Sequence, residues 1–173
     1  QLNGFKSFAD KTSFLIEDGL TGIVGPNGCG KSNIVESLRW VMGETSAKSM
    51  RGSGMEDVIF SGTSNKASKN IAEVLVTVAN ENNEGPIQFR ELDEVNVRRK
   101  IEKDKGSKFY INDKEVRARD AQMFFADLST GAHSPSMISQ GRIGALVTAK
   151  PTDRRAILEE AAGISGLHVR RHE

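Results

Sequence analysis

The stretch "GPNGCGKSN", residues 25–33, decides how this chain folds. It has the pattern of a glycine, four residues, a second glycine, a lysine and a serine, which is typical of phosphate-binding loops. Glycines let successive backbone N–H groups point inward, and a helix that follows presents its positive end to the same point. The stretch therefore predicts an anion nest built largely from the backbone.

The sequence on either side gives this loop the expected context. Residues 22–24 read as a buried strand that runs into the loop. After the loop, four apolar residues recur on one face of a helix that Gly43 would close: Ile34, Leu38, Val41 and Met42. In this arrangement Lys31 lies between the β- and γ-phosphates of a nucleotide, and the Ser32 hydroxyl binds Mg²⁺.

Beyond this core, short strands and one further helix are expected. Apolar and polar residues alternate in two longer segments, and turn residues separate shorter ones. The expected elements are a hairpin within 2–16, strands at 57–60, 72–78 and 95–101, a hairpin at 109–116, a helix over 119–128, a loop over 129–141 and a helix from Pro151.

Composition narrows the class of protein. The chain has 173 residues, 37% of them hydrophobic and 27% charged, which fits one globular domain or one lobe of a larger one. A net charge of +1 gives no bulk argument for nucleic acid or membrane. The single cysteine excludes an internal disulfide, and no apolar run reaches the roughly 18 residues of a membrane helix. We therefore expect a soluble intracellular protein.

Three other features have a structural interpretation that competes with a functional one. Cys29 fits the loop as a small residue, although its thiol would be open to alkylation. His168 and His172 have metal-ligand spacing on a helix, but no third ligand accompanies them. The basic run within 98–108 is mixed with acidic residues, which favours a charged hairpin over a DNA-binding site.

One part of a complete ATPase site is missing. A P-loop ATPase also uses an acidic residue at the end of an apolar strand to hold Mg²⁺. Neither candidate fits: residues 72–81 alternate in polarity, and residues 123–127 look helical. Residues 65–68 lack the acid of a guanine-recognition motif, so guanine specificity has no support.

Six stretches together resemble one protein family over essentially the whole chain. They are "GFKSFAD", "GPNGCGKSNI", "RGSGMEDVIFSGTS", "FYINDKEVR", "ISQGRI" and "PTDRRAILEEAAGIS". In this order they look like the N-terminal half of the ATPase head of structural maintenance of chromosomes (SMC) proteins, most similar to bacterial members. The phosphate loop alone indicates only nucleotide binding; the final stretch separates SMC proteins from their relatives.

The resemblance implies an α/β fold of the P-loop NTPase class. It would be the N-terminal lobe of an ABC-type ATPase head, with antiparallel β elements and a C-terminal helix that starts a coiled coil. The lobe would cover residues 1–162, and the coiled-coil neck would begin in 163–173. In the family, the missing acidic residue, a catalytic glutamate and a Ser-Gly-Gly signature come from a C-terminal half that returns after the coiled coil.

The resemblance also assigns the site residues. Arg51 matches the arginine finger of the family, whose charge would offset negative charge on the phosphates. Gln140 matches the Q-loop residue and would join Ser32 on Mg²⁺, while Lys6 and Ser7 would approach the nucleotide. The phosphates of ATP would be wrapped by Gly25, Pro26, Asn27, Gly28, Cys29, Gly30, Lys31 and Ser32.

The function implied is ATP-driven head engagement and hydrolysis in chromosome condensation, organisation and segregation. Two heads would sandwich two ATP molecules, and the implied partners are the C-terminal half of the head, a second head, a kleisin subunit and DNA, in the nucleoid of the cytoplasm. Alternatives are a RecN-like DNA-repair ATPase head, a small-molecule P-loop kinase, and a module that only binds nucleotide. The final stretch disfavours the first, and no segment resembles the lid that the second needs.

Overall fold

The computed structural model describes residues 1–17, 19–80, 87–128, 150–152 and 154–155. Within these residues the main elements are a five-stranded antiparallel sheet in the order β1-β2-β3-β4-β5 and two α-helices. The strands are β1 (Leu2–Asn3), β2 (Ile71–Ala79), β3 (Glu94–Glu102), β4 (Gly106–Ile111) and β5 (Lys114–Val116). The helices are α1 (Lys31–Val41), α2 (Ala118–Asp127) and the 3₁₀ turns η1 (Lys48–Met50), η2 (Met55–Val58) and η3 (Ile87–Phe89).

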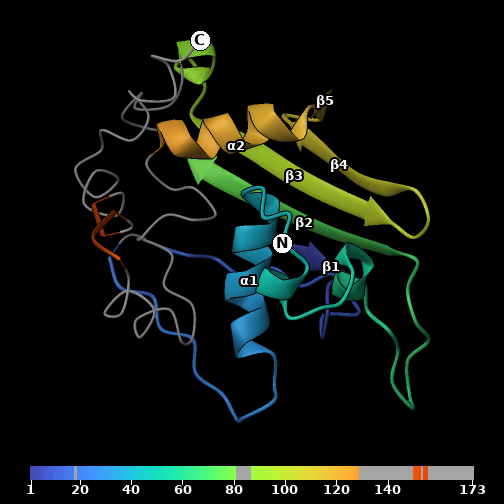
Figure 1. Ribbon diagram of the computed structural model, residues 1–173. Coiled ribbons are helices and arrows are strands. Elements are labelled where there is room, and N and C mark those ends of the chain that lie inside the picture. The colour runs from blue at the N-terminus through green and yellow to red at the C-terminus, as the bar shows by residue number, and fades with distance from the viewer. Residues whose placement is uncertain (18, 81–86, 129–149, 153, 156–173) are drawn as a thin grey trace.

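Both helices pack on the same face of the sheet (Figure 1). Helix α1 contacts β2 and β3, and α2 contacts β4. Alternation along β2 and β3 turns every second side chain toward the helices, where Val74 and Val97 are fully buried. Aromatic rings complete the layer between sheet and helices, with Phe5 and Trp40 at a centroid distance of 5.4 Å. The expected strands over 72–78 and 95–101 are confirmed, and so is the helix expected between the phosphate loop and Gly43, which ends at Val41.

The expected hairpin at 109–116 and the expected helix after it are also confirmed. Asn112 and Asp113 form the turn between β4 and β5, and both have positive φ, at 47° and 62°. Two consecutive residues of this kind define the type I′ turn, whose twist matches that of paired strands. Helix α2 follows, and Arg117 donates its backbone N–H to Asp120 Oδ2 at the helix start.

Two of the expected strands are wrong. Residues 22–24 form no strand, and Val24 is 94% exposed, because no other described segment pairs with this part of the chain. Residues 55–58 form η2 instead of a strand, since the N–H groups of Asp57 and Ile59 bond locally to the carbonyl oxygens of Gly54 and Glu56, at 3.2 and 2.8 Å, and are not offered to a neighbouring strand. Of the expected strand at 57–60, only Ile59 pairs, through a bridge to Phe5.

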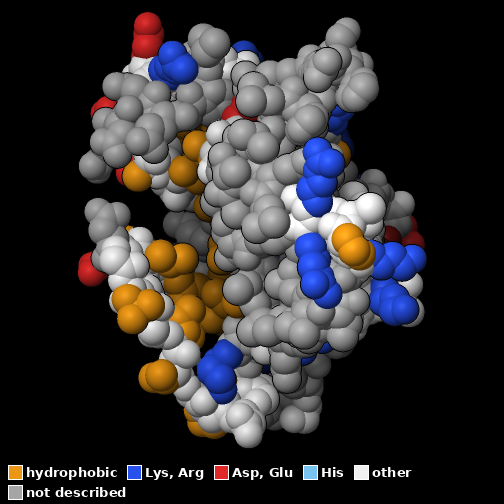
Figure 2. Space-filling view, turned by 60° about the vertical axis from the view of Figure 1, so that its left-hand side comes forward, with side chains coloured by type: hydrophobic (Ala, Val, Ile, Leu, Met, Phe, Trp, Pro, Cys, Tyr) orange, Lys and Arg blue, Asp and Glu red, His pale blue; other side chains and the backbone are white. Residues whose placement is uncertain are grey.

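The segment before the phosphate loop leaves a row of large hydrophobic side chains in solvent. They are Leu15, Ile16, Leu20, Ile23 and Val24. The space-filling view shows hydrophobic side chains gathered in a hollow on one side of the molecule (Figure 2). The hairpin expected within 2–16 is reduced to two isolated bridges. Leu2 and Thr12 exchange two backbone hydrogen bonds of 2.8 Å, and Phe5 and Phe8 exchange two of 3.0 and 2.8 Å.

The helix expected from Pro151 begins as predicted, with residues 151, 152, 154 and 155 helical. Its continuation, the neck at 163–173 and the whole loop over 129–141 lie outside the described residues. Across the described part of the chain, no helix combines the length and the apolar character needed to cross a membrane.

Arg99 is the one charged residue of β3 that points into the core, and its side chain ties the sheet to the C-terminal end of α1. It is only 3% exposed, and its Nη1 donates to the carbonyl oxygens of Trp40 and Glu44 at 2.7 Å each. The guanidinium also lies 4.5 Å from the centre of the Trp40 ring and 4.6 Å from that of Phe109. The Trp40 carbonyl lies in the last turn of α1 and also accepts the Gly43 N–H at 3.1 Å, and Glu44 follows the helix closely, so Arg99 adds a donor where the helix dipole is negative.

Burial lowers the pKa of Arg99 to about 10, and the nearby Glu44 carboxylate opposes this shift. Arg99 therefore stays charged at neutral pH. Glu44 is itself buried and pairs with Arg39 at 2.9 Å. The three side chains form one buried charge cluster, in which each charge has a partner.

Replacing Arg99 with Met should lower the free energy of unfolding by about 3–5 kcal/mol, because the Trp40 and Glu44 carbonyls each lose a buried donor and the buried Glu44 carboxylate loses a nearby positive charge. Urea denaturation followed by circular dichroism measures this change. Lys100→Met, on the opposite face of β3, is the matched control and should change stability by less than about 0.5 kcal/mol. Equal effects of the two substitutions would contradict the structural role of Arg99.

Candidate nucleotide-binding site

The phosphate loop ends directly at the first residue of α1. Gly28 and Gly30 have φ angles of 81° and 95°, which side chains rarely tolerate. Gly30 is the residue before the helix, and a Cβ added to it would collide with the Ser7 hydroxyl. Gly30, the second glycine that the sequence motif requires, and Gly28, one of the four residues before it, therefore occupy positions where the backbone excludes most other residues.

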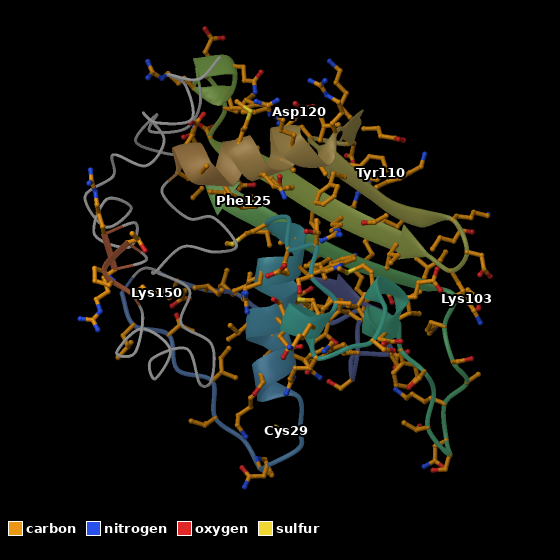
Figure 3. The ribbon with its side chains drawn as sticks, viewed as in Figure 1. Cys29, Lys103, Tyr110, Asp120, Phe125 and Lys150 are labelled. Atoms are coloured by element: carbon orange, nitrogen blue, oxygen red, sulfur yellow. The ribbon has the colours of Figure 1, made fainter. Side chains whose placement is uncertain are left out.

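The Lys31 side chain folds back over this loop. Its Nζ donates to the carbonyl oxygens of Gly25 and Pro26 at 2.5 Å each and lies 3.8 Å from the Cys29 sulfur. The loop thus wraps around an ammonium group at the N-terminal end of α1. Cys29 is exposed and lies at the tip of the molecule, far from α2 (Figure 3).

The start of α1 has the chemistry of an anion site. The first N–H groups of any helix lack an acceptor within the helix, and the helix dipole is positive there. Ser32 is exposed at the second position of α1, where its hydroxyl is accessible as an oxygen ligand. These groups fit the phosphates of a nucleotide with its Mg²⁺. Gln140, the other expected Mg²⁺ ligand, lies outside the described residues.

Lys6 does not extend into solvent, although the sequence suggested that it approaches the nucleotide. Its side chain is 12% exposed, and its Nζ pairs with Glu36 Oε2 at 2.6 Å and with the carbonyl oxygen of Met50. Ser7 lies closer to the loop, since it abuts Gly30 and accepts a hydrogen bond of 2.9 Å from Asn33 Nδ2. The structure therefore places Ser7 next to the phosphate-binding loop at residues 25–32, called the cradle below. Lys6 instead contacts Glu36 and Met50.

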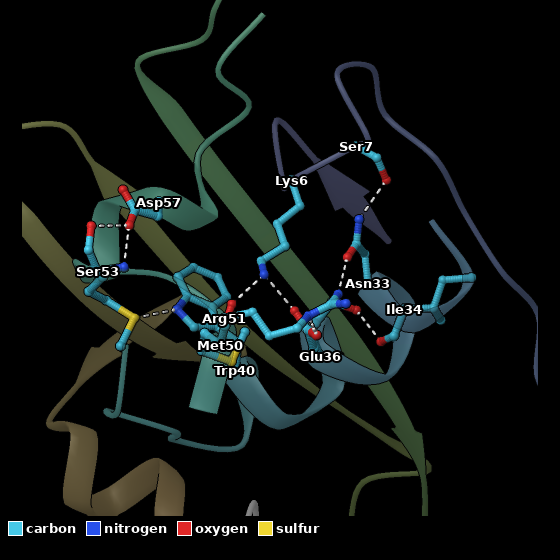
Figure 4. Close-up of polar contacts among 12 residues, drawn as sticks. Lys6, Ser7, Asn33, Ile34, Glu36, Trp40, Met50, Arg51, Ser53 and Asp57 are labelled. Carbon is cyan, nitrogen blue, oxygen red and sulfur yellow. Dashed lines mark hydrogen bonds and ion pairs between the residues drawn. The ribbon is translucent and has the colours of Figure 1, made fainter. Parts of the chain in front are cut away.

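Arg51, the expected arginine finger, is joined to the same helix (Figure 4). Its Nε pairs with Glu36 Oε1, and its Nη2 donates to Asn33 Oδ1 at 2.8 Å. The side chain remains 55% exposed. Arg51 thus lies against the first two turns of α1, immediately beyond the cradle, with part of its guanidinium open to solvent.

The loop that carries Arg51 is shaped by Asp57. The Asp57 carboxylate accepts the backbone N–H groups of Gly54 and Ser53, at 2.9 and 2.6 Å, and the Ser53 hydroxyl at 2.9 Å. The bond from the Gly54 N–H, followed by those from Ser53, lowers the pKa of Asp57. The carboxylate is therefore charged at neutral pH and holds residues 51–54 in a tight turn.

Sequence reasoning missed Glu36 and Asn33, which join the expected site residues to one another. Glu36 is 8% exposed on its side chain, although a glutamate normally lies at the surface. The one available signal was its spacing of four residues before Trp40, which places the two side chains on the same face of α1.

The other charged candidates have partners of their own. Arg98 pairs with Glu73 and Asp113 at 3.6 and 2.9 Å, and its guanidinium stacks on Tyr110, which supports the charged-hairpin interpretation of 98–108. Arg99 also belongs to this basic run, but unlike Arg98 it is buried in the core. His168 and His172 lie outside the described residues, and within the described ones no group of three metal-ligating side chains forms.

Comparison with known proteins agrees with this geometry. The family model described as "RecF/RecN/SMC N terminal domain" matches residues 1–142. The chromosome partition protein Smc of Cereibacter sphaeroides is 57% identical over 173 residues, which cover 100% of this chain and 15% of that protein. The chain thus spans about 15% of the length of this curated relative.

Two solved structures share the fold over most of this chain. One, from work on ATP-driven dimerization and DNA-stimulated activation of SMC ATPases, is 32% identical with a TM-score of 0.80, and the match covers 92% of this chain and 95% of that one. The Smc head of Pyrococcus furiosus, with an extended coiled coil and bound to the C-terminal domain of ScpA, is 31% identical with a TM-score of 0.87, over 99% of this chain and 42% of that one.

The family model matches residues 1–142, which include the phosphate loop, and the similarity to the curated relative and to the two solved structures extends over most of this chain. The chain therefore belongs to the SMC family and is the N-terminal half of its ATPase head.

Proposed function

We propose that this chain binds Mg-ATP and forms the nucleotide-binding half of an ATPase head that acts in chromosome condensation, organisation and segregation. The observation that carries the proposal is the wrapping of the Lys31 ammonium by a loop with two left-handed glycines at the N-terminal end of α1. A fixed cation and unpaired helix N–H groups in one place are what a polyphosphate requires.

Each residue of the site has a stated task in this proposal. Lys31 leaves its carbonyl partners to bind phosphate oxygens, and the loop from Gly25 to Ser32 surrounds the phosphates. Ser32 and Gln140 hold Mg²⁺, which neutralises charge on the phosphate oxygens when it is bound. Arg51 contributes a cation beside the same end of α1, where it offsets negative charge on the nucleotide.

The C-terminal half of the head is proposed as the first partner. It covers the exposed hydrophobic segment from Leu15 to Val24 and supplies the missing acidic residues. Two observations support this assignment: the large apolar side chains of this segment lie in solvent, and the relatives are far longer than this chain. Burying that much apolar surface stabilises an association strongly.

The remaining partners are proposed from the relatives. A second head and DNA follow from the ATP-driven dimerization and DNA stimulation named for one SMC ATPase structure. A kleisin subunit follows from the ScpA domain bound to the Pyrococcus furiosus head. Because the proposed task is performed on a chromosome, we propose that the protein acts in the cytoplasm, at the nucleoid.

A RecN-like repair ATPase head has less support, because the shared family model covers both groups but the similarity to a chromosome partition protein extends over the whole chain. Nucleotide binding without turnover remains the expected behaviour of this chain when it is alone. This behaviour is consistent with the main proposal, because the chain alone lacks the C-terminal half of the head.

Lys31→Ala should abolish measurable binding of a fluorescent ATP analogue, because it removes the cation from the centre of the loop. Isothermal titration or fluorescence anisotropy measures the loss. Lys48→Ala removes an exposed lysine from η1 and should leave the affinity unchanged. Retained binding by the Lys31 variant would overturn the cradle assignment.

Arg51→Ala should spare ATP binding and slow turnover by a head that includes the C-terminal half, since Arg51 lies beside the cradle and outside it. Turnover is measured as phosphate release, with and without DNA. The chain alone should show negligible turnover. Hydrolysis by the chain alone would show that the missing acid lies within these residues.

Val24→Asp should weaken association with the C-terminal half by at least about 10-fold, because it would place a charge in the buried part of the new interface. Analytical ultracentrifugation of the two halves measures this affinity. Met123→Asp, on a partly exposed position of α2, is the control and should leave it unchanged. Equal affinities for both variants would place the interface elsewhere.

A further inference from the structure

Glu36 lies between two cations and gives one carboxylate oxygen to each. Oε2 pairs with Lys6 Nζ at 2.6 Å, and Oε1 pairs with Arg51 Nε. The carboxylate is 8% exposed, and the Lys6 side chain 12%. A buried carboxylate with two opposite charges is strongly held, since losing either cation would leave unbalanced charge in a poorly solvated place.

The Asn33 amide makes a second connection around this carboxylate. Its oxygen accepts from Arg51 Nη2 at 2.8 Å, and its nitrogen donates to Ser7 Oγ at 2.9 Å. Ser7 in turn lies against Gly30 of the phosphate loop. Direct contacts therefore run from the cradle through Ser7 and Asn33 to the guanidinium of Arg51.

These contacts close into a ring. Lys6 precedes Ser7 in the chain, Met50 precedes Arg51, and Lys6 Nζ donates to the carbonyl oxygen of Met50. Glu36 is at the centre of the ring, between the two cations that it pairs (Figure 4). These contacts thus hold three segments as one unit: the N-terminal turn (residues 5–8), the first turns of α1 and the arginine loop (residues 51–54).

The backbone at both cations is unusual in the same way. Lys6 and Arg51 have φ angles of 46° and 54°, in the left-handed region that residues other than glycine, asparagine and aspartate rarely adopt. Such residues persist where surrounding contacts determine them, and they gather at functional sites. Here the determining contacts are those to Glu36 and its neighbours.

We propose that Glu36 is the positioning residue of Arg51: its carboxylate fixes the guanidinium beside the cradle, and Lys6 balances the second half of its charge. The effect of this positioning on catalysis rests on the proposed function. Lys6 then acts through Glu36 and does not contact the nucleotide, while Arg51 keeps one exposed side for the phosphates. A carboxylate balanced in this way holds an arginine near ATP without adding net negative charge.

The position of Arg51 can be tested without any enzymatic activity, in the head completed by its C-terminal half. Phenylglyoxal modifies accessible arginines, and mass spectrometry gives the rate at each one. Glu36→Gln should raise the rate at Arg51 several-fold while that at exposed Arg90 stays constant. Glu73→Gln, which removes one of the two acidic partners of Arg98 on the other face of the sheet, should leave the labelling rate at Arg51 unchanged.

Turnover then tests whether that position matters. Glu36→Gln should reduce turnover about as much as Arg51→Ala does while ATP affinity stays within about 3-fold, and the double variant should be no slower than either single one, as expected of residues that act as a unit. Glu36→Asp keeps the charge but shortens the side chain, and should give an intermediate labelling rate and turnover. This variant separates positioning from loss of folding.

Two results would overturn the proposal. Unchanged phenylglyoxal labelling of Arg51 in a folded Glu36→Gln head would show that Glu36 does not hold it. Multiplicative losses of turnover in the double variant would show that the two residues act independently. A wild-type head without turnover would refute the proposed function instead, and the labelling would still decide whether Glu36 positions Arg51.

Discussion

The contact between the Arg99 guanidinium and the end of α1 is the interaction on which the rest of the structure depends. It places a charged group of β3 against two carbonyl oxygens and two aromatic rings in the core. The sheet thereby fixes both the position and the direction of the helix. Because α1 begins at Lys31, fixing its far end also orients the phosphate loop.

A cluster of charged side chains thus holds each end of α1, and the two clusters have different roles. At its C-terminal end the charges are Arg39, Glu44 and Arg99, all buried and all remote from the cradle. At its N-terminal end, Glu36 and Asn33 connect the arginine loop and the N-terminal turn to the first residues of the helix. A rigid helix between these two clusters suits a site that must keep its cations in place while a nucleotide binds.

The exposed hydrophobic segment before the loop contrasts with this rigid core. The residues from Leu15 to Val24 contain the apolar pattern of a buried strand, yet they find no strand to pair with among the described residues. A strand is completed only by its neighbours, since its backbone groups need partners across the sheet. The same segment is therefore both the largest departure from the expected fold and the main support for a second half of the head.

The sequence by itself determined the phosphate loop, the helix after it, the long antiparallel strands and the hairpin at Asn112, because each depends on local glycine positions or on short-range periodicity. It also carried the family resemblance. Only the tertiary structure decided that Arg99 is buried, that Glu36 joins Lys6 to Arg51, and that residues 55–58 close into a 3₁₀ turn. These features arise from contacts between residues far apart in the chain, or from competition between local and cross-strand hydrogen bonds, and a linear pattern records neither.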